Sequence, residues 1–240
     1  MRDSVPFQMV TSEAHDREIA AMFDRIAARY DFLNRVLSFG TDIGWRRRAL
    51  AHAAIEREHA VLDVGAGTGD LSFAAAAISA RVVAVDLSAG MLAVLARRAT
   101  ALQRSRIQTL VGNAEALPLP DASIDRLVTG FTVRNVGDLA RALAEFRRVL
   151  RPGGRAVILE LSHPPSPAFA DLYSFYFDRI APTIAGLLGG DREAYRYLPR
   201  SLRPFPVAER LADLLREAGF VRVSYERVTF GIAAIHVGEV

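Results

Sequence analysis

Ten residues, Val61–Asp70 (VLDVGAGTGD), constrain the fold of this chain more than any other segment. An apolar run that contains one acid, Asp63, leads into Gly65, Gly67 and Gly69, and a helical pattern follows. This order predicts a strand, a tight turn and a helix N-terminus. A helix start presents free backbone N–H groups, and glycines let a ligand approach the backbone closely. We therefore expect the floor of a nucleotide-type site at this turn.

The rest of the chain repeats a strand–helix rhythm. Strands are predicted over 61–64, 81–86, 107–111, 124–130 and 156–161, and helices over 70–78, 89–102 and 138–150. Such alternation predicts a parallel sheet that is covered on both faces, and right-handed crossovers make it doubly wound. A helix over 207–218, stopped by Gly219, precedes strands over 221–228 and 231–237 that form a hairpin. With helices over 15–58, the expected fold is an α/β, Rossmann-like, mostly parallel sheet with a C-terminal antiparallel hairpin, the layout of class I methyltransferases.

Composition excludes several kinds of site. The chain has 240 residues, 51% of them hydrophobic, which suits a large buried core, and it has no cysteine. Disulfides, thiolate metal sites and cysteine nucleophiles are therefore excluded, and the five histidines are scattered, so we expect no metal. All 30 basic residues are arginine, spread thinly for a net charge of +3. The one run of three, Arg46–Arg48, is expected on a solvated helix face, and we expect no nucleic-acid partner.

The spacing of the glycine turn selects among cofactors. A P-loop ends in GK[ST], whereas this turn ends in GTGD. A dinucleotide site has G-x-G-x-x-G, which is one residue longer than the spacing here. Asp63 would repel a pyrophosphate but suits a cation. The segment therefore resembles the first motif of methyltransferases that use S-adenosylmethionine, which carries a sulfonium and an ammonium group.

Later strand ends supply the rest of the expected cofactor site. Asp86 ends the second strand, where a carboxylate binds both ribose hydroxyls in Rossmann-type sites. Asn113 and Ala114 follow the third strand and are placed to meet the adenine edge, and Met91 either packs on the adenine ring or belongs to the core. The complete predicted set is Asp63, Gly65, Gly67, Thr68, Gly69, Asp86, Leu87, Met91, Asn113, Ala114 and Gly130.

Four segments make the resemblance more specific. Tyr30–Trp45, Phe131–Val136, Arg148–Ser162 and Glu193–Ser201 resemble the ubiquinone/menaquinone-biosynthesis C-methyltransferase family, and the likeness runs from about residue 20 to the C-terminus. The resemblance implies methylation of a ring carbon of a polyprenylated benzo- or naphthohydroquinone. The chain departs from the family pattern at Leu33 (usually Met), Asp42 (usually His), Gly130 (usually Ser) and Ala156 (usually a larger aliphatic residue). Asp42 bears on acceptor specificity and leaves the reaction class unaffected.

The resemblance also implies roles on the acceptor side. Arg134 would stabilise a developing phenolate or hold a water that removes the proton. Asn135 would orient Arg134, and Tyr30 would bond the acceptor oxygen. Simpler roles stay open: Arg134 would instead pair with Asp138 at a helix start, and Tyr30 would be a packing aromatic.

The expected organisation has three parts. Residues 1–58 form an N-terminal helical cap, residues 59–240 form the methyltransferase domain, and residues 163–205 form an insertion or lid on the acceptor side. The prolines and the aromatic run Leu172–Phe177 in that insertion suit either a channel for a prenyl tail or ordinary helical core.

The predicted reaction is methylation of demethylmenaquinol to menaquinol. Three alternatives stay open: a ubiquinone-pathway benzoquinol C-methyltransferase, a methyltransferase of a soluble phenol or polyketide, and a non-catalytic scaffold that binds S-adenosylmethionine. The N-terminus lacks the apolar core of a secretory signal, and no apolar stretch reaches the roughly 20 residues of a membrane span. We expect a cytoplasmic location, with peripheral contact to the inner face of the cell membrane and a homodimer as further options.

Overall fold

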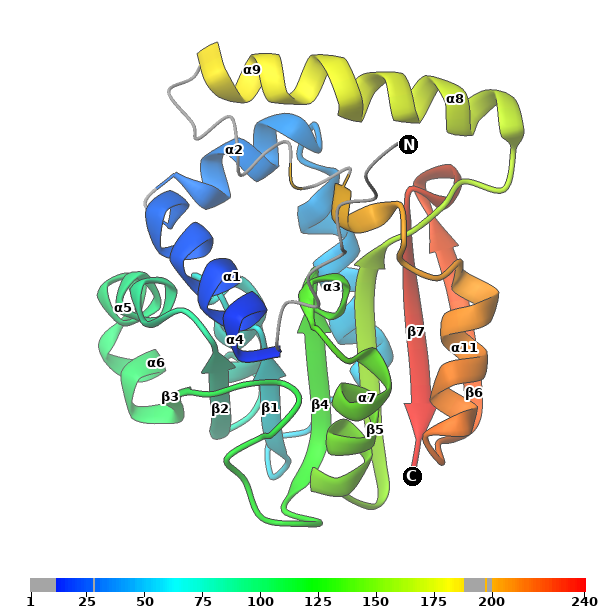
Figure 1. Ribbon diagram of the computed structural model, residues 1–240. Helices are drawn as coiled ribbons and strands as arrows, with labels where there is room; N and C mark the ends of the chain where they lie inside the picture. Colours follow the sequence, from blue (N-terminus) through cyan, green and yellow to red (C-terminus); the bar gives the residue numbers. More distant parts are fainter. Residues whose placement is uncertain (1–11, 28, 188–196, 198–199) are drawn as a thin grey trace, which may run out of the picture.

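A seven-stranded mixed sheet forms the centre of the molecule (Figure 1). The computed structural model describes residues 12–27, 29–187, 197 and 200–240. The strand order is β3-β2-β1-β4-β5-β7-β6. The first five strands in this order are parallel, and β7 pairs antiparallel with both β5 and β6. The strands are β1 (Ala60–Val64), β2 (Arg81–Asp86), β3 (Ile107–Val111), β4 (Ile124–Gly130), β5 (Leu150–Leu161), β6 (Val221–Val228) and β7 (Ala233–Glu239). The predicted fold class and terminal hairpin are confirmed.

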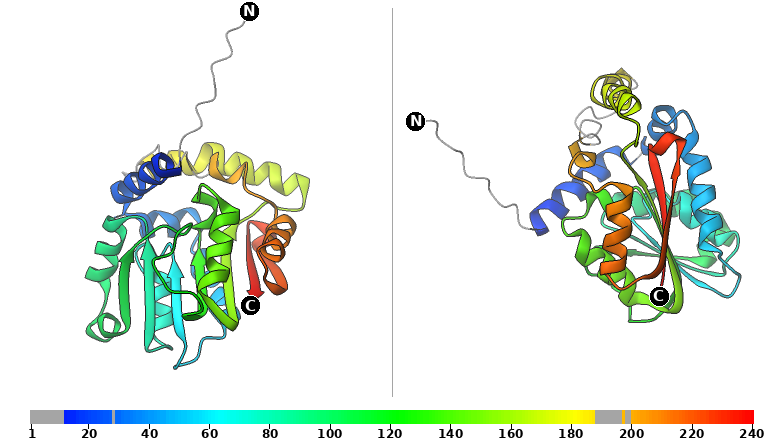
Figure 2. Two further views of the ribbon diagram at one scale, coloured as in Figure 1. Left: turned by 60° about the horizontal axis from the view of Figure 1, so that its bottom comes forward. Right: turned by 90° about the vertical axis from the view of Figure 1, so that its right-hand side faces the viewer.

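Helices cover both faces of the sheet (Figure 2). Two views agree that α3 and α4 lie on one face and that α7 and α11 lie on the other, while α5 and α6 pack beside β2 and β3. Every residue of β1 is consequently buried, as expected of a central parallel strand. The helices are α1 (Ser12–Ile26), α2 (Tyr30–Leu37), α3 (Thr41–Ala53), α4 (Asp70–Ala76), α5 (Ala89–Arg98), α6 (Ala101–Arg106), α7 (Leu139–Val149), α8 (Pro167–Phe175), α9 (Ala181–Leu187) and α11 (Ala208–Glu217), with a π-helical turn, Tyr176–Ile180, between α8 and α9.

Three sequence predictions of element boundaries need correction. The helix predicted over 89–102 is two helices, because Thr100 and Gln103 form a capping box that starts α6. The strand predicted over 156–161 begins earlier, at Leu150, and its pairing register with β4 shifts between Ile124 and Arg126. The last strand begins at Ala233 rather than Gly231, because a short 3-10 turn occupies Thr229–Gly231.

Segments from two distant parts of the sequence cover the carboxyl ends of the parallel strands. Figure 1 shows α1 and α2 on one side of this edge, and the rod formed by α8 and α9 across its top. Helix α3 differs from the rest of the predicted cap, because Trp45, Ala49 and Ala53 pack into the main core with the strands. The division of the chain at residue 58 stays a prediction, and within residues 163–205 the segments 188–196 and 198–199 lie outside the described residues. No described helix combines the length and apolar character that crossing a bilayer requires.

Candidate active site

Two cavities meet at the carboxyl edge of the sheet. The first, of about 100 Å³, is lined by the glycine turn and the ends of β1, β2 and β4. The second, of about 490 Å³, lies under α8 and α9 and is lined mainly by apolar and aromatic side chains. Four residues line both cavities: Phe23, Tyr30, Arg46 and Phe131. A group bound in one cavity can therefore reach a group bound in the other.

The glycine turn is held tightly between two strands. The N–H groups of Gly65 and Ala66 both donate to the Val85 carbonyl, at 2.8 and 3.0 Å. Gly65 has φ +68°, and a Cβ atom there would lie 2.0 Å from Oγ1 of Thr132. A side chain at this position is excluded both by conformation and by space, so the first glycine has a structural reason to be present.

Asp63 brings an unsatisfied carboxylate oxygen to the first cavity. Its Oδ2 accepts a hydrogen bond from Oγ of Ser72 at 2.6 Å, whereas Oδ1 is buried without a partner among the described residues. Burial raises the pKa of Asp63 to about 7, helped by the nearby carboxylate of Asp86. A buried acceptor without a donor is costly, and a cation would satisfy it. The carboxylates of Asp63 and Asp86 thus suit a positively charged ligand and would repel a pyrophosphate.

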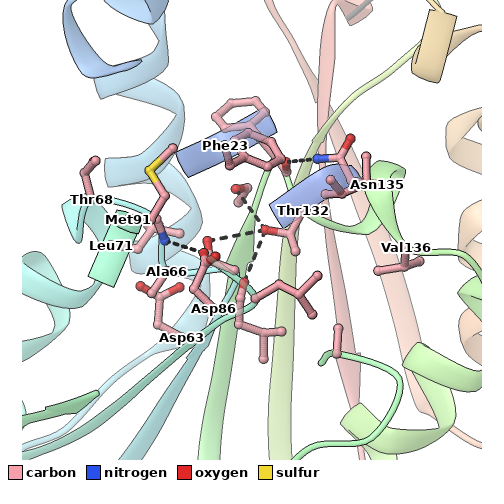
Figure 3. Close-up of a pocket in the computed structure, with 18 of the residues that line it drawn as sticks. Phe23, Asp63, Ala66, Thr68, Leu71, Asp86, Met91, Thr132, Asn135 and Val136 are labelled. Carbon is pink, nitrogen blue, oxygen red and sulfur yellow. Dashed lines mark hydrogen bonds between the residues drawn. The ribbon is translucent and has the colours of Figure 1, made fainter. Parts of the chain in front are cut away.

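Asp86 lies beside the turn with both oxygens fixed (Figure 3). Oδ2 accepts from the Gly67 N–H and Oδ1 from the Ser88 N–H, each at 2.8 Å. Each carboxylate oxygen can accept a second hydrogen bond, so Asp86 keeps capacity for two hydroxyl groups. Burial raises the pKa of Asp86. Ser88, rather than Asp86, caps α5 by accepting from the Met91 N–H at 3.0 Å.

Helix α1 covers the first cavity. Figure 3 shows Phe23 of α1 on the side of the cavity opposite Asp63 and Asp86. Asp16 of α1 accepts from Nδ2 of Asn113 at 2.7 Å, so the side chain predicted to meet an adenine edge is already engaged. With α1 in this position the cavity is smaller than the roughly 300–1,000 Å³ of typical ligand pockets. The residues fit S-adenosylmethionine by chemistry, whereas the space left beside α1 in this position is small.

The structure brings almost the whole predicted cofactor set together. All of it lines the first cavity except Gly69. Gly69 is the N-cap of α4 at φ +100°, and a Cβ there would meet Cγ of Leu95 at 2.7 Å, so its role in the fold is structural. Thr68 lines the cavity and also donates from Oγ1 to Asp31, at 2.5 Å. Sequence reasoning missed the contribution of α1, which no motif marks, and gave no cofactor role to Thr132 within the segment Phe131–Val136.

Arg134 lines the second cavity and is fixed by a buried ion pair. Its Nη1 pairs with Glu160, whose side chain is only 1% exposed. Its Nε donates to Oγ of Ser201 at 2.9 Å. Burial raises the pKa of Glu160, while the Arg134 charge opposes that shift. Asp138 does not pair with Arg134, because its carboxylate caps α7 by accepting from the Arg141 N–H at 3.0 Å.

The orienting role predicted for Asn135 stays a prediction. Its Nδ2 donates to the Phe131 carbonyl at 3.3 Å and its side chain lines the first cavity, whereas Glu160 and Ser201 make the side-chain contacts to Arg134. Sequence reasoning placed Glu160 only as an interior residue of the fifth strand. Because a strand residue gives no sign of the partner above it, the pair could not be read from spacing.

Tyr30 lies where the two cavities meet. Burial raises the pKa of its hydroxyl, while the Arg46 guanidinium and a hydrogen bond with Asn34 act in the opposite direction. Its ring also packs edge-on against Phe23, with 5.9 Å between the centroids. Both roles considered for Tyr30 are therefore compatible with its position. Tyr195, in the segment that resembles the family, lies outside the described residues.

Comparison with known proteins decides the family. A model of the ubiE/COQ5 methyltransferase family matches residues 10–239. The chain belongs to this family. The resemblance inferred from Tyr30–Trp45 and the three later segments is confirmed, and the chain is an S-adenosylmethionine-dependent C-methyltransferase.

Relatives agree with this assignment, and a solved structure shares the fold. A demethylmenaquinone methyltransferase from Thermus thermophilus is 46% identical over 220 residues, which cover 91% of this chain and 99% of that protein. A ubiquinone/menaquinone biosynthesis C-methyltransferase from Methylobacterium nodulans is 40% identical over 237 residues, covering 97% and 94%. The fold matches a SAM-dependent methyltransferase from Thermotoga maritima with a TM-score of 0.66 at 22% identity, covering 91% of this chain and 98% of that one.

Proposed function

We propose that the chain transfers a methyl group from S-adenosylmethionine to a ring carbon of demethylmenaquinol, giving menaquinol. The observation that carries this proposal is the contact between the two cavities at Tyr30, Arg46 and Phe131. One cavity presents an unsatisfied carboxylate for a cation, and the other is large and apolar. The names of relatives from Thermus thermophilus and Deinococcus radiodurans, both demethylmenaquinone methyltransferases, support the naphthoquinol acceptor.

On the cofactor side, we assign roles to two carboxylates and to the residues around the adenine. Asp63 would face the ammonium or sulfonium charge, and Asp86 would accept from the two ribose hydroxyls. Met91 and Phe23 would pack on the adenine ring. Asn113 and Ala114 would contact the edge of the adenine. S-adenosylmethionine, when bound, supplies a methyl group on a positively charged sulfur.

On the acceptor side, Arg134 would hold the ring through the one nitrogen that remains. Glu160 takes Nη1 and Ser201 takes Nε, so Nη2 of Arg134 has no hydrogen-bond partner in the described part of the chain. A donor fixed in this way points in one direction, and positioning of the acceptor carbon contributes much of the rate in a displacement reaction. Tyr30 would donate to an acceptor oxygen at the junction.

Reaction of the purified protein with demethylmenaquinol and S-adenosylmethionine tests the proposal. We expect methylated menaquinol by mass spectrometry, and loss of cofactor binding but an intact fold in Asp86→Ala. Arg134→Ala should bind the cofactor as wild type does and lose methyl transfer. Transfer to a prenylated benzohydroquinone alone would select the ubiquinone-pathway alternative. Transfer to soluble phenols alone would select a methyltransferase of small phenols or polyketides. Cofactor binding without any transfer would select the non-catalytic scaffold.

We further propose that the face around the larger cavity contacts a membrane surface, where a prenylated acceptor resides. Phe39 and Phe230 are about 80% exposed, and their rings lie 5.9 Å from Tyr176 and 5.5 Å from Phe169, both of which line that cavity. Leu172 and Phe175 line the cavity and are themselves exposed, by 62% and 56%. Exposed large apolar side chains that gather at one opening are typical of an interaction site.

Co-sedimentation with phosphatidylglycerol vesicles tests the membrane contact. The double variant Phe39→Ser with Phe230→Ser should release the protein from vesicles, whereas Ile78→Ser, an exposed apolar residue just after α4, should not. Equal binding of all three proteins would refute this surface. The cytoplasmic location, the homodimer and the absence of a metal requirement stay predictions, which fractionation, analytical ultracentrifugation and assay in chelator would test.

A further inference from the structure

Arg46 occupies a different environment from its two neighbours in sequence. The sequence prediction that Arg46–Arg48 form a solvated helix face is wrong for Arg46, which lines both cavities and has only 14% of its side chain exposed. Arg47 is exposed, and Arg48 is exposed and pairs with Glu226 on β6. One arginine of the three is thus turned toward the site.

Two contacts, each supported by a further neighbour, hold Arg46 in place. Its Nη1 pairs with the buried carboxylate of Asp42, which also accepts from Oγ of Ser38 at 2.8 Å. Its guanidinium carbon lies 5.0 Å from the centroid of the Phe131 ring, a cation–π contact. The Phe131 ring in turn packs against Trp45, with 6.2 Å between centroids. A long side chain that is normally mobile is therefore fixed at the junction.

The fixed guanidinium keeps donors available. Only Nη1 is engaged, so Nε and Nη2 of Arg46 have no hydrogen-bond partner among the described residues. The charge also acts on the groups around the junction, because it opposes the burial-driven rise in the pKa of both Tyr30 and Asp63. Any hydroxyl group held there would meet the same positive charge.

A hydroquinone carbon becomes a good nucleophile when the neighbouring hydroxyl is ionised. Its O–H proton must leave to solvent while the oxygen keeps the electron pair. As the new carbon–carbon bond forms and the carbon–sulfur bond breaks, that electron pair moves into the ring and the sulfur leaves as a neutral thioether. The methylated carbon then releases its hydrogen to solvent as a proton and the oxygen takes up a proton, which restores the aromatic hydroquinone. A cation positioned where charge develops stabilises the ionised state more than water does. Arg134 is less suited to this role, because, within the described segments, Glu160 and Ser201 already engage two of its nitrogens and leave only Nη2, whereas Arg46 keeps both Nε and Nη2.

We propose that Arg46 is a catalytic residue that binds the ionised hydroxyl of the acceptor through Nε and Nη2, with Asp42 as the residue that positions it. This inference rests on the proposed function, since it concerns the same reaction. It also gives a role to Asp42, which stands where the family pattern has histidine. A carboxylate there accepts from arginine and leaves the other guanidinium nitrogens free.

The test compares Arg46→Gln with Arg47→Gln, the same substitution one residue along α3. The probe is 1-naphthol, an aromatic alcohol whose ionised form has its own absorbance band. Wild type should lower the pKa of bound 1-naphthol, and Arg46→Gln should raise it again by at least one unit. Methyl transfer to demethylmenaquinol should fall about 100-fold in kcat, as expected for loss of a donor at a developing oxyanion. Arg47→Gln should behave as wild type in both measurements.

Two further measurements separate this role from a structural one. Calorimetry should give an affinity of Arg46→Gln for S-adenosylmethionine equal to or tighter than that of wild type, because a positive charge has been removed beside a cationic ligand. Arg46→Lys keeps the charge without the planar fork, so it should restore the naphthol shift in part. It also serves as the test if Arg46→Gln does not fold.

Each outcome has one meaning. A naphthol pKa that is the same in wild type and Arg46→Gln overturns the inference, as does a tenfold loss of cofactor affinity in that variant. If wild type shifts the naphthol pKa through Arg46 but does not methylate demethylmenaquinol, the proposed acceptor is wrong and the role of Arg46 stands. If wild type methylates demethylmenaquinol and Arg46→Gln does so equally well, the proposed function stands and the inference fails.

Discussion

Replacement of Asp63 by asparagine should remove part of the pH dependence of stability in the unliganded protein. Wild type should lose stability between mildly acidic and neutral pH, and Asp63→Asn should keep it. Burial raises the pKa of Asp63 from 3.8 to about 7. The unfolded chain releases this proton near pH 4, whereas the folded chain keeps it until about pH 7. The stability that the group contributes is therefore complete below pH 4 and is lost as the pH rises through 7. Asparagine has no proton to release, so Asp63→Asn removes this dependence.

The magnitude follows from the linkage. One unit of pKa difference corresponds to about 1.4 kcal/mol, so over the two units between pH 5 and 7 wild type should lose about 3 kcal/mol that the variant keeps. Urea unfolding of both proteins at pH 5 and at pH 8 measures this loss. The quantity compared is the change in unfolding free energy between the two pH values, in wild type and in Asp63→Asn. Any pH-independent effect of the substitution, including an unpaired amide group, cancels in that comparison.

A matched control has the opposite electrostatics. Burial acts to raise the pKa of Asp125, but the Ala60 N–H and the Arg151 guanidinium together hold it below its usual value. Asp125→Asn should therefore change stability by the same amount at pH 5 and pH 8. Asp63→Asn should also weaken S-adenosylmethionine binding about 10- to 100-fold, as loss of a charge-assisted bond implies. A pH-independent difference between Asp63→Asn and wild type would refute the reasoning about the buried carboxylate.

Three shorter predictions follow from the contacts described above. Glu160→Gln leaves Arg134 without its buried partner, so it should destabilise the fold by about 3–5 kcal/mol in urea unfolding; a change below 1 kcal/mol would mean that the pair relaxes at little cost. Gly65→Ala should abolish cofactor binding or folding, because its Cβ would meet Thr132 at 2.0 Å. Gly67→Ala meets no atom within 4 Å and carries only the strain of φ +55°, so it should keep the fold and a weakened but measurable affinity in calorimetry. Tyr173→Phe should keep or raise the melting temperature, because the Tyr173 hydroxyl is buried without a partner among the described residues; a drop of several degrees would reveal a contact to that hydroxyl.

Much of the fold could be predicted because its signals are local. The boundaries predicted for the strands 81–86, 107–111, 124–130 and 221–228 are those of β2, β3, β4 and β6. Apolar β-branched runs between turn residues mark such strands directly in the sequence. The cofactor side was accessible for the same reason, since a parallel sheet brings the residues that follow its strands to one edge.

The acceptor side was accessible only in part, because it depends on contacts between distant segments. Glu160 and Ser201 meet Arg134 across 26 and 67 residues of sequence. Arg46 and Arg47 are adjacent residues of the same type, so the sequence does not distinguish them. Only the packing of α3 on the sheet turns one of them toward the site. The cover provided by α1 is a further case: nothing in the pattern of Asp16 or Phe23 indicates which part of the sheet the helix would meet.

The position of α1 has a consequence for the order of events in a catalytic cycle. Its polar contacts, from Asp16 to Asn113 and from Asp24 to Ser88 and Gly90, hold it against a cavity of about 100 Å³. A nucleoside-sized ligand needs more room than this. We therefore expect the exchange of spent for fresh cofactor to involve a displacement of α1. The larger cavity is lined by Phe39 and not by residues of these contacts, so we expect the lipid acceptor to enter its cavity without displacing them.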